Sequence, residues 1–162
     1  MISLIFLCVT KLATSQSPLV SDFCHKGGIQ EPNFCLRFLG LDSRSKTATS
    51  AHDLEGITID WGSEYAKTVT SKALSFLQSA TDPKVEAALS ACVQAYTTLN
   101  FDFNTIRAAF QSGTSIAEQA ANARLAVSNC NQAFSEKQLL SPLANDNNKL
   151  LSFIQIILAN GV

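Results

Sequence analysis

Apolar side chains recur every three or four positions along most of the chain, the period of helices that bury one face. In the clearest segment, residues 85–110, steps of four and three alternate strictly. The apolar positions there are Val85, Leu89, Cys92, Tyr96, Leu99, Phe103, Ile106 and Phe110. This heptad pattern is typical of helices packed close to parallel or antiparallel. It predicts a helix that has Asp82 as its N-cap, begins at Pro83 and stops at Ser112 and Gly113.

A second helix is predicted from Ser50 to about Gln78. It begins with a capping-box spacing, because Asp53 stands three residues after Ser50 and can reach back to it. The apolar face consists of Leu54, Ile57, Trp61, Tyr65, Val69, Ala73 and Phe76. Gly56 and Gly62 interrupt this helix, and each weakens it by about 1 kcal/mol relative to alanine.

The two helices nearest the C-terminus differ in character. Ser115 and Glu118 form another capping-box spacing, followed by a seam of smaller residues that permits close helix approach. That seam consists of Ile116, Ala120, Ala123, Val127, Cys130 and Phe134. The C-terminal segment is apolar on nearly all sides, which predicts a buried helix capped by Asn145 or Asp146 and ending at Gly161.

Residues 16–40 hold two shorter apolar sets, separated by a turn at Gly27 and Gly28. Pro32 stands early in the second set, where its missing N–H costs nothing, and this set ends at Gly40. The pattern predicts a helical hairpin over residues 16–40. Residues 41–50 are polar and show no buried face, so they are predicted to be a linker.

No stretch alternates with period two for long enough to predict a strand. The four long helical segments are joined by short connections, which make consecutive helices antiparallel neighbours. The predicted fold is therefore all-α: an up-down-up-down four-helix bundle over residues 41–162, preceded by the N-terminal helical hairpin.

Residues 1–15 have the composition of a signal peptide. An apolar run from Ile2 to Val9 is followed by Ala13 and Ser15, the spacing that signal peptidase accepts, so cleavage is predicted after Ser15. The run is about half the roughly 20 residues that a membrane-spanning helix needs. We therefore expect a secreted protein. A net charge of −1 provides no electrostatic basis for binding nucleic acid or an anionic membrane, and neither is expected as a partner.

Four cysteines remain once the signal peptide, with Cys8, is removed. They are Cys24, Cys35, Cys92 and Cys130, and in an oxidising compartment an even number favours two disulfides. The count alone allows three pairings. However, Cys92 and Cys130 lie on the seams of consecutive antiparallel helices, where their side chains can approach each other, and pairing them leaves Cys24 with Cys35.

The residues needed for catalysis or metal binding are not grouped in the sequence. Its two histidines, His25 and His52, are interpreted as exposed loop or capping residues, and neither C-x-x-C nor H-x-x-x-H occurs. The acidic pairs Asp53 with Glu55 and Asp60 with Glu64 are placed on the solvent sides of their helix by its phase. We expect no catalytic residues, no metal, no cofactor and no enzymatic activity, which leaves binding as the function.

Several motifs together resemble the plant invertase and pectin methylesterase inhibitor family. They are the Cys24 to Cys35 hairpin, D-L-E-G at 53–56, D-P-K at 82–84, C-V-Q-A-Y at 92–96, and C-N-Q-A-F at 130–134 followed by S-P at 141–142. Within the family, the chain is most similar to invertase inhibitors of the pollen-allergen type. The resemblance implies a secreted, helical, non-enzymatic protein in which neighbouring cysteines are paired and which binds a plant cell-wall or vacuolar invertase 1:1.

The resemblance also implies a target-binding segment. Invertase inhibitors of this family carry Pro-Lys-Phe in the loop before the third bundle helix, and the corresponding stretch here is residues 112–118, with Ile116 in place of the phenylalanine and neither the proline nor the lysine. The expected target-binding residues are Gly113, Thr114, Ser115, Ile116 and Glu118.

Three alternatives remain open. The chain can inhibit pectin methylesterase through polar helix faces, or it can be a family member of the allergen type without inhibitory activity. The apolar end LLSFIQIILANGV can also be the signal for a lipid anchor, although three polar residues interrupt it. No N-x-S/T acceptor occurs, so we expect no N-linked glycan.

Overall fold

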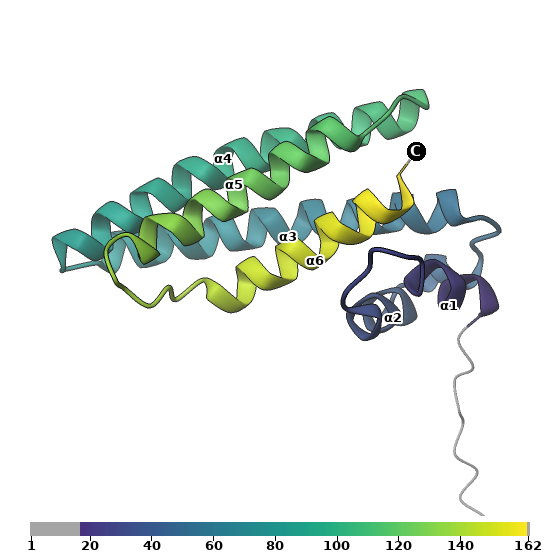
Figure 1. Ribbon diagram of the computed structural model, residues 1–162, viewed down its shortest axis with the longest axis horizontal. Helices are drawn as coiled ribbons and strands as arrows, with labels where there is room; N and C mark the ends of the chain where they lie inside the picture. The colour runs from purple at the N-terminus through teal and green to yellow at the C-terminus, as the bar shows by residue number, and fades with distance from the viewer. Residues whose placement is uncertain (1–16, 162) are drawn as a thin grey trace, which may run out of the picture.

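The computed structural model describes residues 17–161, and all its regular elements over this range are helices. The predicted signal peptide lies outside the described residues. Four long helices form an antiparallel bundle, with the hairpin packed against one end (Figure 1). The elements are α1 (Pro18–Cys24), α2 (Pro32–Leu41), the 3₁₀ helix η1 (Ser43–Lys46), α3 (Ala51–Ser79), α4 (Pro83–Ser112), α5 (Ala117–Ser135) and α6 (Ala144–Asn160). The predicted all-α bundle with an N-terminal hairpin is confirmed.

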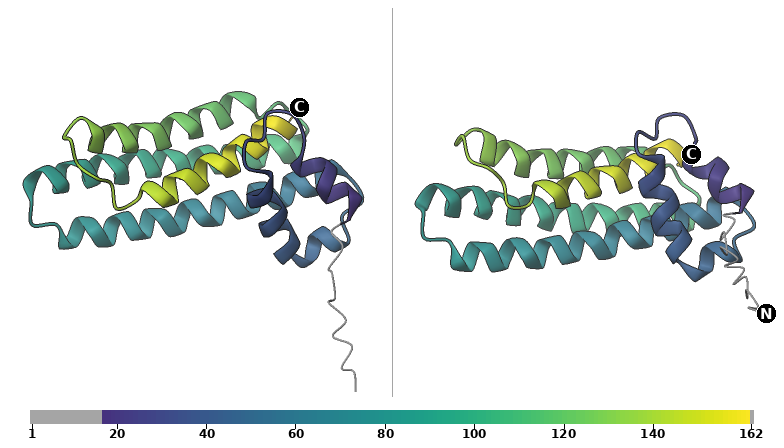
Figure 2. Two further views of the ribbon diagram at one scale, coloured as in Figure 1. Left: turned by 60° about the horizontal axis from the view of Figure 1, so that its bottom comes forward. Right: turned by 90° about the horizontal axis from the view of Figure 1, so that it is seen from below.

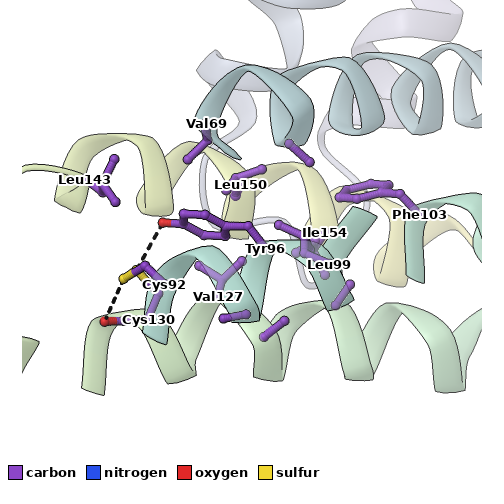
Figure 3. Close-up of a cluster of buried hydrophobic side chains, with 14 of the residues drawn as sticks. Val69, Cys92, Tyr96, Leu99, Phe103, Val127, Cys130, Leu143, Leu150 and Ile154 are labelled. Atoms are coloured by element: carbon purple, nitrogen blue, oxygen red, sulfur yellow. Dashed lines mark hydrogen bonds between the residues drawn. A yellow bond between two sulfur atoms is a disulfide. The ribbon is translucent and has the colours of Figure 1, made fainter. Parts of the chain in front are cut away.

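The heptad seam of α4 forms the centre of the bundle. α4 packs along α3 on one side and along α5 on the other, while α6 closes the bundle between α3 and α5 (Figure 1). Tyr96, Leu99 and Phe103 are fully buried (Figure 3), and so is Ile106. The strict alternation in the sequence therefore marks the side chains of α4 that face the common core of the bundle.

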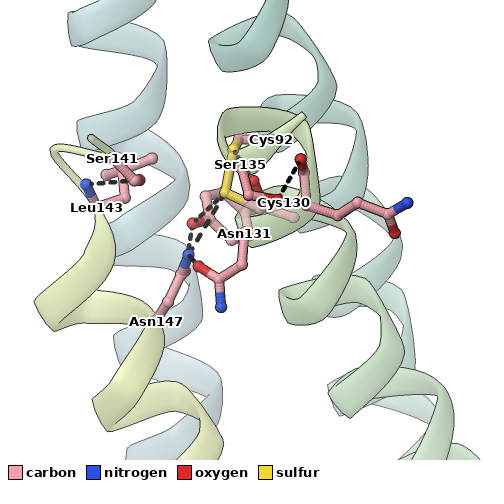
Figure 4. The surroundings of a disulfide bond; sticks show 9 residues. Cys92, Cys130, Asn131, Ser135, Ser141, Leu143 and Asn147 are labelled. Carbon is pink, nitrogen blue, oxygen red and sulfur yellow. Dashed lines mark hydrogen bonds between the residues drawn. A yellow bond between two sulfur atoms is a disulfide. The ribbon is translucent and has the colours of Figure 1, made fainter. Parts of the chain in front are cut away.

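Small side chains let α5 come close to α4. Ala120 and Ala123 are fully buried at this contact, and Ala126 nearly so. Cys92 of α4 and Cys130 of α5 form a disulfide across it, with Cα atoms 4.3 Å apart (Figure 4). The predicted pairing is confirmed, as is the second disulfide, Cys24 to Cys35, inside the hairpin.

A buried polar cluster surrounds the bundle disulfide. The Tyr96 hydroxyl donates to Asn147 Oδ1 at 2.5 Å. Asn147 Nδ2 donates to Asn131 Oδ1 at 2.6 Å (Figure 4). Burial raises the pKa of Tyr96, so its hydroxyl keeps the proton that it donates. The cluster links α4, α5 and α6 at the point where the disulfide already joins two of them.

A second core attaches the hairpin to the bundle. Phe38 and Phe34 of α2 pack on Phe153 of α6, with ring centroids 5.0 Å and 4.9 Å apart. Val20 and Phe23 of α1 belong to the same buried cluster. The hairpin thus lies across α3 and α6 and is packed on them (Figure 2).

The helix starts agree with the sequence in two places. Ser50 caps α3 in a complete capping box, in which the Asp53 carboxylate accepts from the Ser50 backbone N–H. Asp82 caps α4 directly before Pro83. At the other end of α4, Gly113 adopts the left-handed conformation, with φ of 68°, that a helix C-terminus favours.

Two predicted caps are wrong. α5 begins after Ile116 without a capping side chain, and Ser115 instead accepts from the Ala117 N–H. α6 begins after Leu143 without a capping side chain, so neither Asn145 nor Asp146, the two predicted candidates, caps it, and both lie inside the helix. The Asp146 carboxylate accepts from the Tyr65 hydroxyl and from Lys72 Nζ, each at 2.7 Å. The Asp146 side chain therefore binds α3, whereas the sequence pattern assigned it to the start of α6.

α6 belongs to the bundle core. Leu150, Ile154 and Ile157 are completely buried in it. Within residues 17–161, no helix combines the length and apolar character needed to cross a bilayer. The packing of α6 argues against its removal as a lipid-anchor signal, because the bundle would lose one of its four long helices and expose its core.

Candidate functional site

The predicted target-binding residues lie where several chain segments meet at one end of the bundle. The α4–α5 connection, the beginning of α3, the end of α6 and the hairpin are all found there (Figures 1 and 2). We call this region the hairpin end. The opposite end carries the α3–α4 and α5–α6 connections.

Hydrogen bonds hold the α4–α5 connection in shape. The Thr114 backbone N–H donates to the Ala109 carbonyl at 3.0 Å, and the Thr114 and Ser112 hydroxyls are 3.1 Å apart. Thr114, Ser115 and Glu118 are exposed. Thr114 and Ser115 are therefore available to a partner on a connection whose backbone is fixed, and Glu118 is available beside them in the first turn of α5.

Ile116 is placed differently from its predicted neighbours. Only 2% of it is exposed, and it belongs to the bundle core. It packs so closely on Gly161, after the end of α6, that a Cβ on that glycine would lie 2.7 Å from Ile116 Cδ1. Ile116 thus anchors the connection to α6 and offers a partner little surface. The target-binding role of the set stays a prediction.

Beside this connection is a small hollow of about 210 Å³ that the sequence did not indicate. Its lining is His52, Glu55, Phe110, Gly113, Thr114 and Ile116, and we call it the Glu55 pocket. The His52 ring stacks on Phe110 at 4.1 Å with 18° between the planes. Side chains from α3 and α4 thereby meet the predicted target-binding segment.

Glu55 contradicts its predicted position on the solvent side of α3. The residue is only 6% exposed, and its burial raises the pKa of its carboxyl, against the opposing effect of His52 and Lys26. The helix phase alone could not show this, because the α4–α5 connection and the hairpin cover a side of α3 that lies outside its main apolar stripe.

A larger groove of about 580 Å³ lies on the other side of Phe110. We call it the Arg44 groove, after the network of charges along it. Arg44 bonds Asp42 at 2.8 Å and Asp60 at 2.5 Å, and Asp60 also pairs with Arg107 of α4. The pKa of Asp42 is lowered to about 2, and the largest cause is its hydrogen bonding with the Arg44 guanidinium. Asp60 was predicted to face solvent, but it bridges two arginines instead.

Neither histidine lies in a catalytic arrangement. His25 Nδ1 bonds the Ser21 carbonyl at 2.8 Å at the end of α1, which is the capping role expected of it. His52 is exposed and stacked on Phe110. Over residues 17–161, no group of three or more His, Cys, Asp and Glu side chains is arranged to hold a metal ion.

Comparison with known proteins gives a consistent result. The family model described as plant invertase/pectin methylesterase inhibitor matches residues 18–159. A solved structure of a mutant form of a pectin methylesterase inhibitor from Arabidopsis superposes with a TM-score of 0.74 at 22% identity, covering 89% of this chain and 95% of that one.

A pectin methylesterase inhibitor from Arabidopsis thaliana superposes with a TM-score of 0.65 at 19% identity, covering 87% of this chain and 92% of the other. At these identities, the likeness shows the shared fold. No curated protein sequence matches the chain closely enough to count as a relative.

Proposed function

Because the chain belongs to the plant invertase/pectin methylesterase inhibitor family, we propose that it is a secreted inhibitor of a plant acid invertase, which it binds 1:1. The proposed contact surface is the hairpin end, with Thr114 and Ser115 of the α4–α5 connection and Glu118 in the first turn of α5 at its centre. The protein then acts by occupying the enzyme and performs no chemistry of its own.

The observation that carries this proposal is the construction of the α4–α5 connection. Its backbone is fixed by hydrogen bonds to the end of α4, and Ile116 holds it against α6, while three polar side chains remain exposed. A rigid surface loses little conformational entropy when it binds, so more of the contact energy appears as affinity.

The first experiment measures residual activity of a purified plant acid invertase and, in parallel, of a plant pectin methylesterase at mildly acidic pH. The oxidised protein from residue 16 onward is added to each. Inhibition of invertase alone supports the proposal, and inhibition of the esterase alone contradicts it.

The contact surface is tested with a triple variant, Thr114→Ala, Ser115→Ala and Glu118→Ala, which leaves Ile116 in the core. We expect at least tenfold weaker invertase inhibition, equivalent to about 1.4 kcal/mol. The matched control is Lys84→Ala with Glu86→Ala, two exposed residues at the opposite end of the bundle. If both variants inhibit like the unchanged protein, the contact surface lies elsewhere.

Pectin methylesterase is a second candidate target, reached through the sides of the bundle. Phe101 of α4 is 69% exposed and Leu125 of α5 is 60% exposed, so these helices present large apolar side chains to solvent. Aromatic side chains such as that of Phe101 are enriched where proteins bind each other. On this alternative, Phe101→Ser and Leu125→Ser weaken esterase inhibition, whereas the triple variant of the connection does not.

Secretion is proposed on the two disulfides together with residues 1–15. Both disulfides are buried, and such bonds persist in oxidising compartments outside the cytosol. Mass spectrometry of the mature protein tests the expected N-terminus at residue 16, and the same spectrum tests the lipid-anchor alternative at the C-terminus.

A further inference from the structure

The Glu55 pocket contains a buried carboxyl group that has no partner. Glu55 is more than nine-tenths buried, and within residues 17–161 its side chain makes no hydrogen bond or ion pair. His52 and Lys26 influence it only through longer-range charge interactions. The carboxylate oxygens keep a little contact with solvent, but an unpaired carboxylate that has lost most of its surrounding water is still costly. A ligand that supplies positive charge or hydrogen-bond donors would remove that cost.

The walls of the pocket are aromatic and apolar. The Phe110 ring is partly exposed and carries the stacked His52 ring on it. Gly56 leaves room for Phe110, because a Cβ there would lie only 3.1 Å from Phe110 Cε1. Ile116 also lines the pocket, with the little apolar surface that it leaves exposed. The pocket therefore combines one acidic group with two stacked rings and a small aliphatic contribution.

This combination selects for a particular ligand chemistry. A cation gains from the face of an aromatic ring and from a charge-assisted hydrogen bond to a carboxylate. A guanidinium satisfies both requirements, since it is flat, permanently charged and able to donate two parallel hydrogen bonds. The volume of about 210 Å³ is smaller than that of a usual small-molecule site and suits one side chain.

We propose that the Glu55 pocket receives a basic side chain, preferably that of an arginine, from the enzyme that this protein inhibits. The inference rests on the proposed function, because it places the pocket within the inhibitory contact surface. Thr114 contributes to both the pocket and the exposed connection, so one approaching surface reaches both.

A titration of the free protein tests the pocket without any enzyme. The probe is N-acetyl-L-arginine amide, and its control is N-acetyl-L-citrulline amide, which has nearly the same shape and no charge. We expect the arginine probe to shift the NMR signals of His52, Glu55 and Thr114, and to do so much less in a Glu55→Gln variant. Equal shifts with both probes, or no shift with either, would overturn the inference.

Inhibition assays then test the role of the pocket in the complex. We expect Glu55→Gln to weaken inhibition at least tenfold, while Glu64→Gln, an exposed residue further along α3, changes it less than twofold. Glu55→Gln removes an unpaired charge from the interior, so its melting temperature should equal or exceed that of the unchanged protein. Full inhibition by Glu55→Gln would overturn the inference.

Failure of the proposed function gives a different pattern. If the unchanged protein inhibits neither enzyme, the proposed function is wrong, and the titration alone decides on the pocket. A selective response to the arginine probe then keeps the pocket as a site for a basic side chain of another partner. If the arginine probe gives no selective response either, both the proposed function and the proposed role of the Glu55 pocket are wrong.

Discussion

Gly62 shows why a residue that weakens a helix can stabilise the protein. It lies in the middle of α3, where glycine costs about 1 kcal/mol relative to alanine. In the structure, a Cβ at this position would lie 2.7 Å from Cε1 of Phe103, and Phe103 is completely buried. The missing side chain therefore makes space for a ring from α4, and the sequence could not show that, because the ring comes from another helix.

We expect Gly62→Ala to destabilise the protein by about 1–3 kcal/mol, because the overpacked Phe103 ring outweighs the gain in helix propensity. Chemical unfolding followed by circular dichroism measures the change. Ser71→Ala is the matched control: it lies on the exposed side of the same helix and should change the free energy of unfolding by less than about 0.5 kcal/mol. A Gly62→Ala protein more stable than the original would mean that Phe103 moves aside at little cost.

Glu55 and Asp102 show what helix phase leaves out. Asp102 is only 6% exposed, and burial raises the pKa of its carboxyl, as burial does for Glu55. Phase divides a helix into one core stripe and one solvent face. In a bundle, neighbouring helices and connections cover part of the remaining surface, so carboxylates outside the apolar stripe also become buried.

At the level of helices, the sequence predicted best where a signal is local. The α3 capping box, the Asp82 and Pro83 start of α4 and the glycine at its end all involve residues within one turn of each other. The caps of α5 and α6 were wrong because Ile116 and Asp146 are held by contacts with distant helices. η1 and the buried Ser45 likewise appear in a stretch that was predicted to be a plain linker.

The two disulfides should contribute unequally to stability. In the chain-entropy account, the Cys92 to Cys130 bond, with a sequence separation of 38, stabilises by about 4 kcal/mol, and the Cys24 to Cys35 bond, with a separation of 11, by about 3 kcal/mol. Cys92 and Cys130 also lie against the Tyr96 and Asn147 cluster, so replacing them disturbs buried hydrogen bonds as well.

We therefore expect the double replacement of Cys92 and Cys130 by alanine to lower the melting temperature more than the same replacement of Cys24 and Cys35. Thermal unfolding followed by circular dichroism compares the two variants under identical conditions. A larger effect of the hairpin bond would show that the hairpin's core, and not the bundle, limits the stability of the whole protein.

For the whole molecule, the main question is how the hairpin and the bundle are held together. Apolar packing on Phe153 supplies one part of the answer. The other is the charge network of the Arg44 groove, where Asp42, directly after α2, binds Arg44 and accepts from the Trp61 indole N–H at 2.9 Å. Arg44 continues the network to Asp60 on α3. These contacts span up to 19 residues of sequence, so no local pattern could predict them.

The Asp42 network should make hairpin attachment depend on pH. The pKa of Asp42 is about 2 in the folded protein, against 3.8 for an ordinary aspartate. A carboxyl whose pKa is lower when folded stabilises the fold above its unfolded pKa, and this contribution is lost as the pH falls from about 4 towards 2. At the mildly acidic pH of the inhibition assay, the network should therefore be fully formed.

Asp42→Asn keeps a side-chain oxygen for Trp61 but removes the charge that Arg44 binds. We expect it to lower the free energy of unfolding at pH 6 by about 1–2 kcal/mol, since solvent screens part of the interaction. Trp61 is the only tryptophan in the sequence, so its fluorescence reports unfolding next to the altered residue. The difference between the two proteins should shrink as the pH approaches 2. Glu64→Gln, which removes only an exposed pair with Lys67, should change stability by less than about 0.5 kcal/mol at every pH. A constant difference across the acid range would mean that Asp42 acts through its hydrogen bond to Trp61, and that packing on Phe153 is what mainly holds the hairpin.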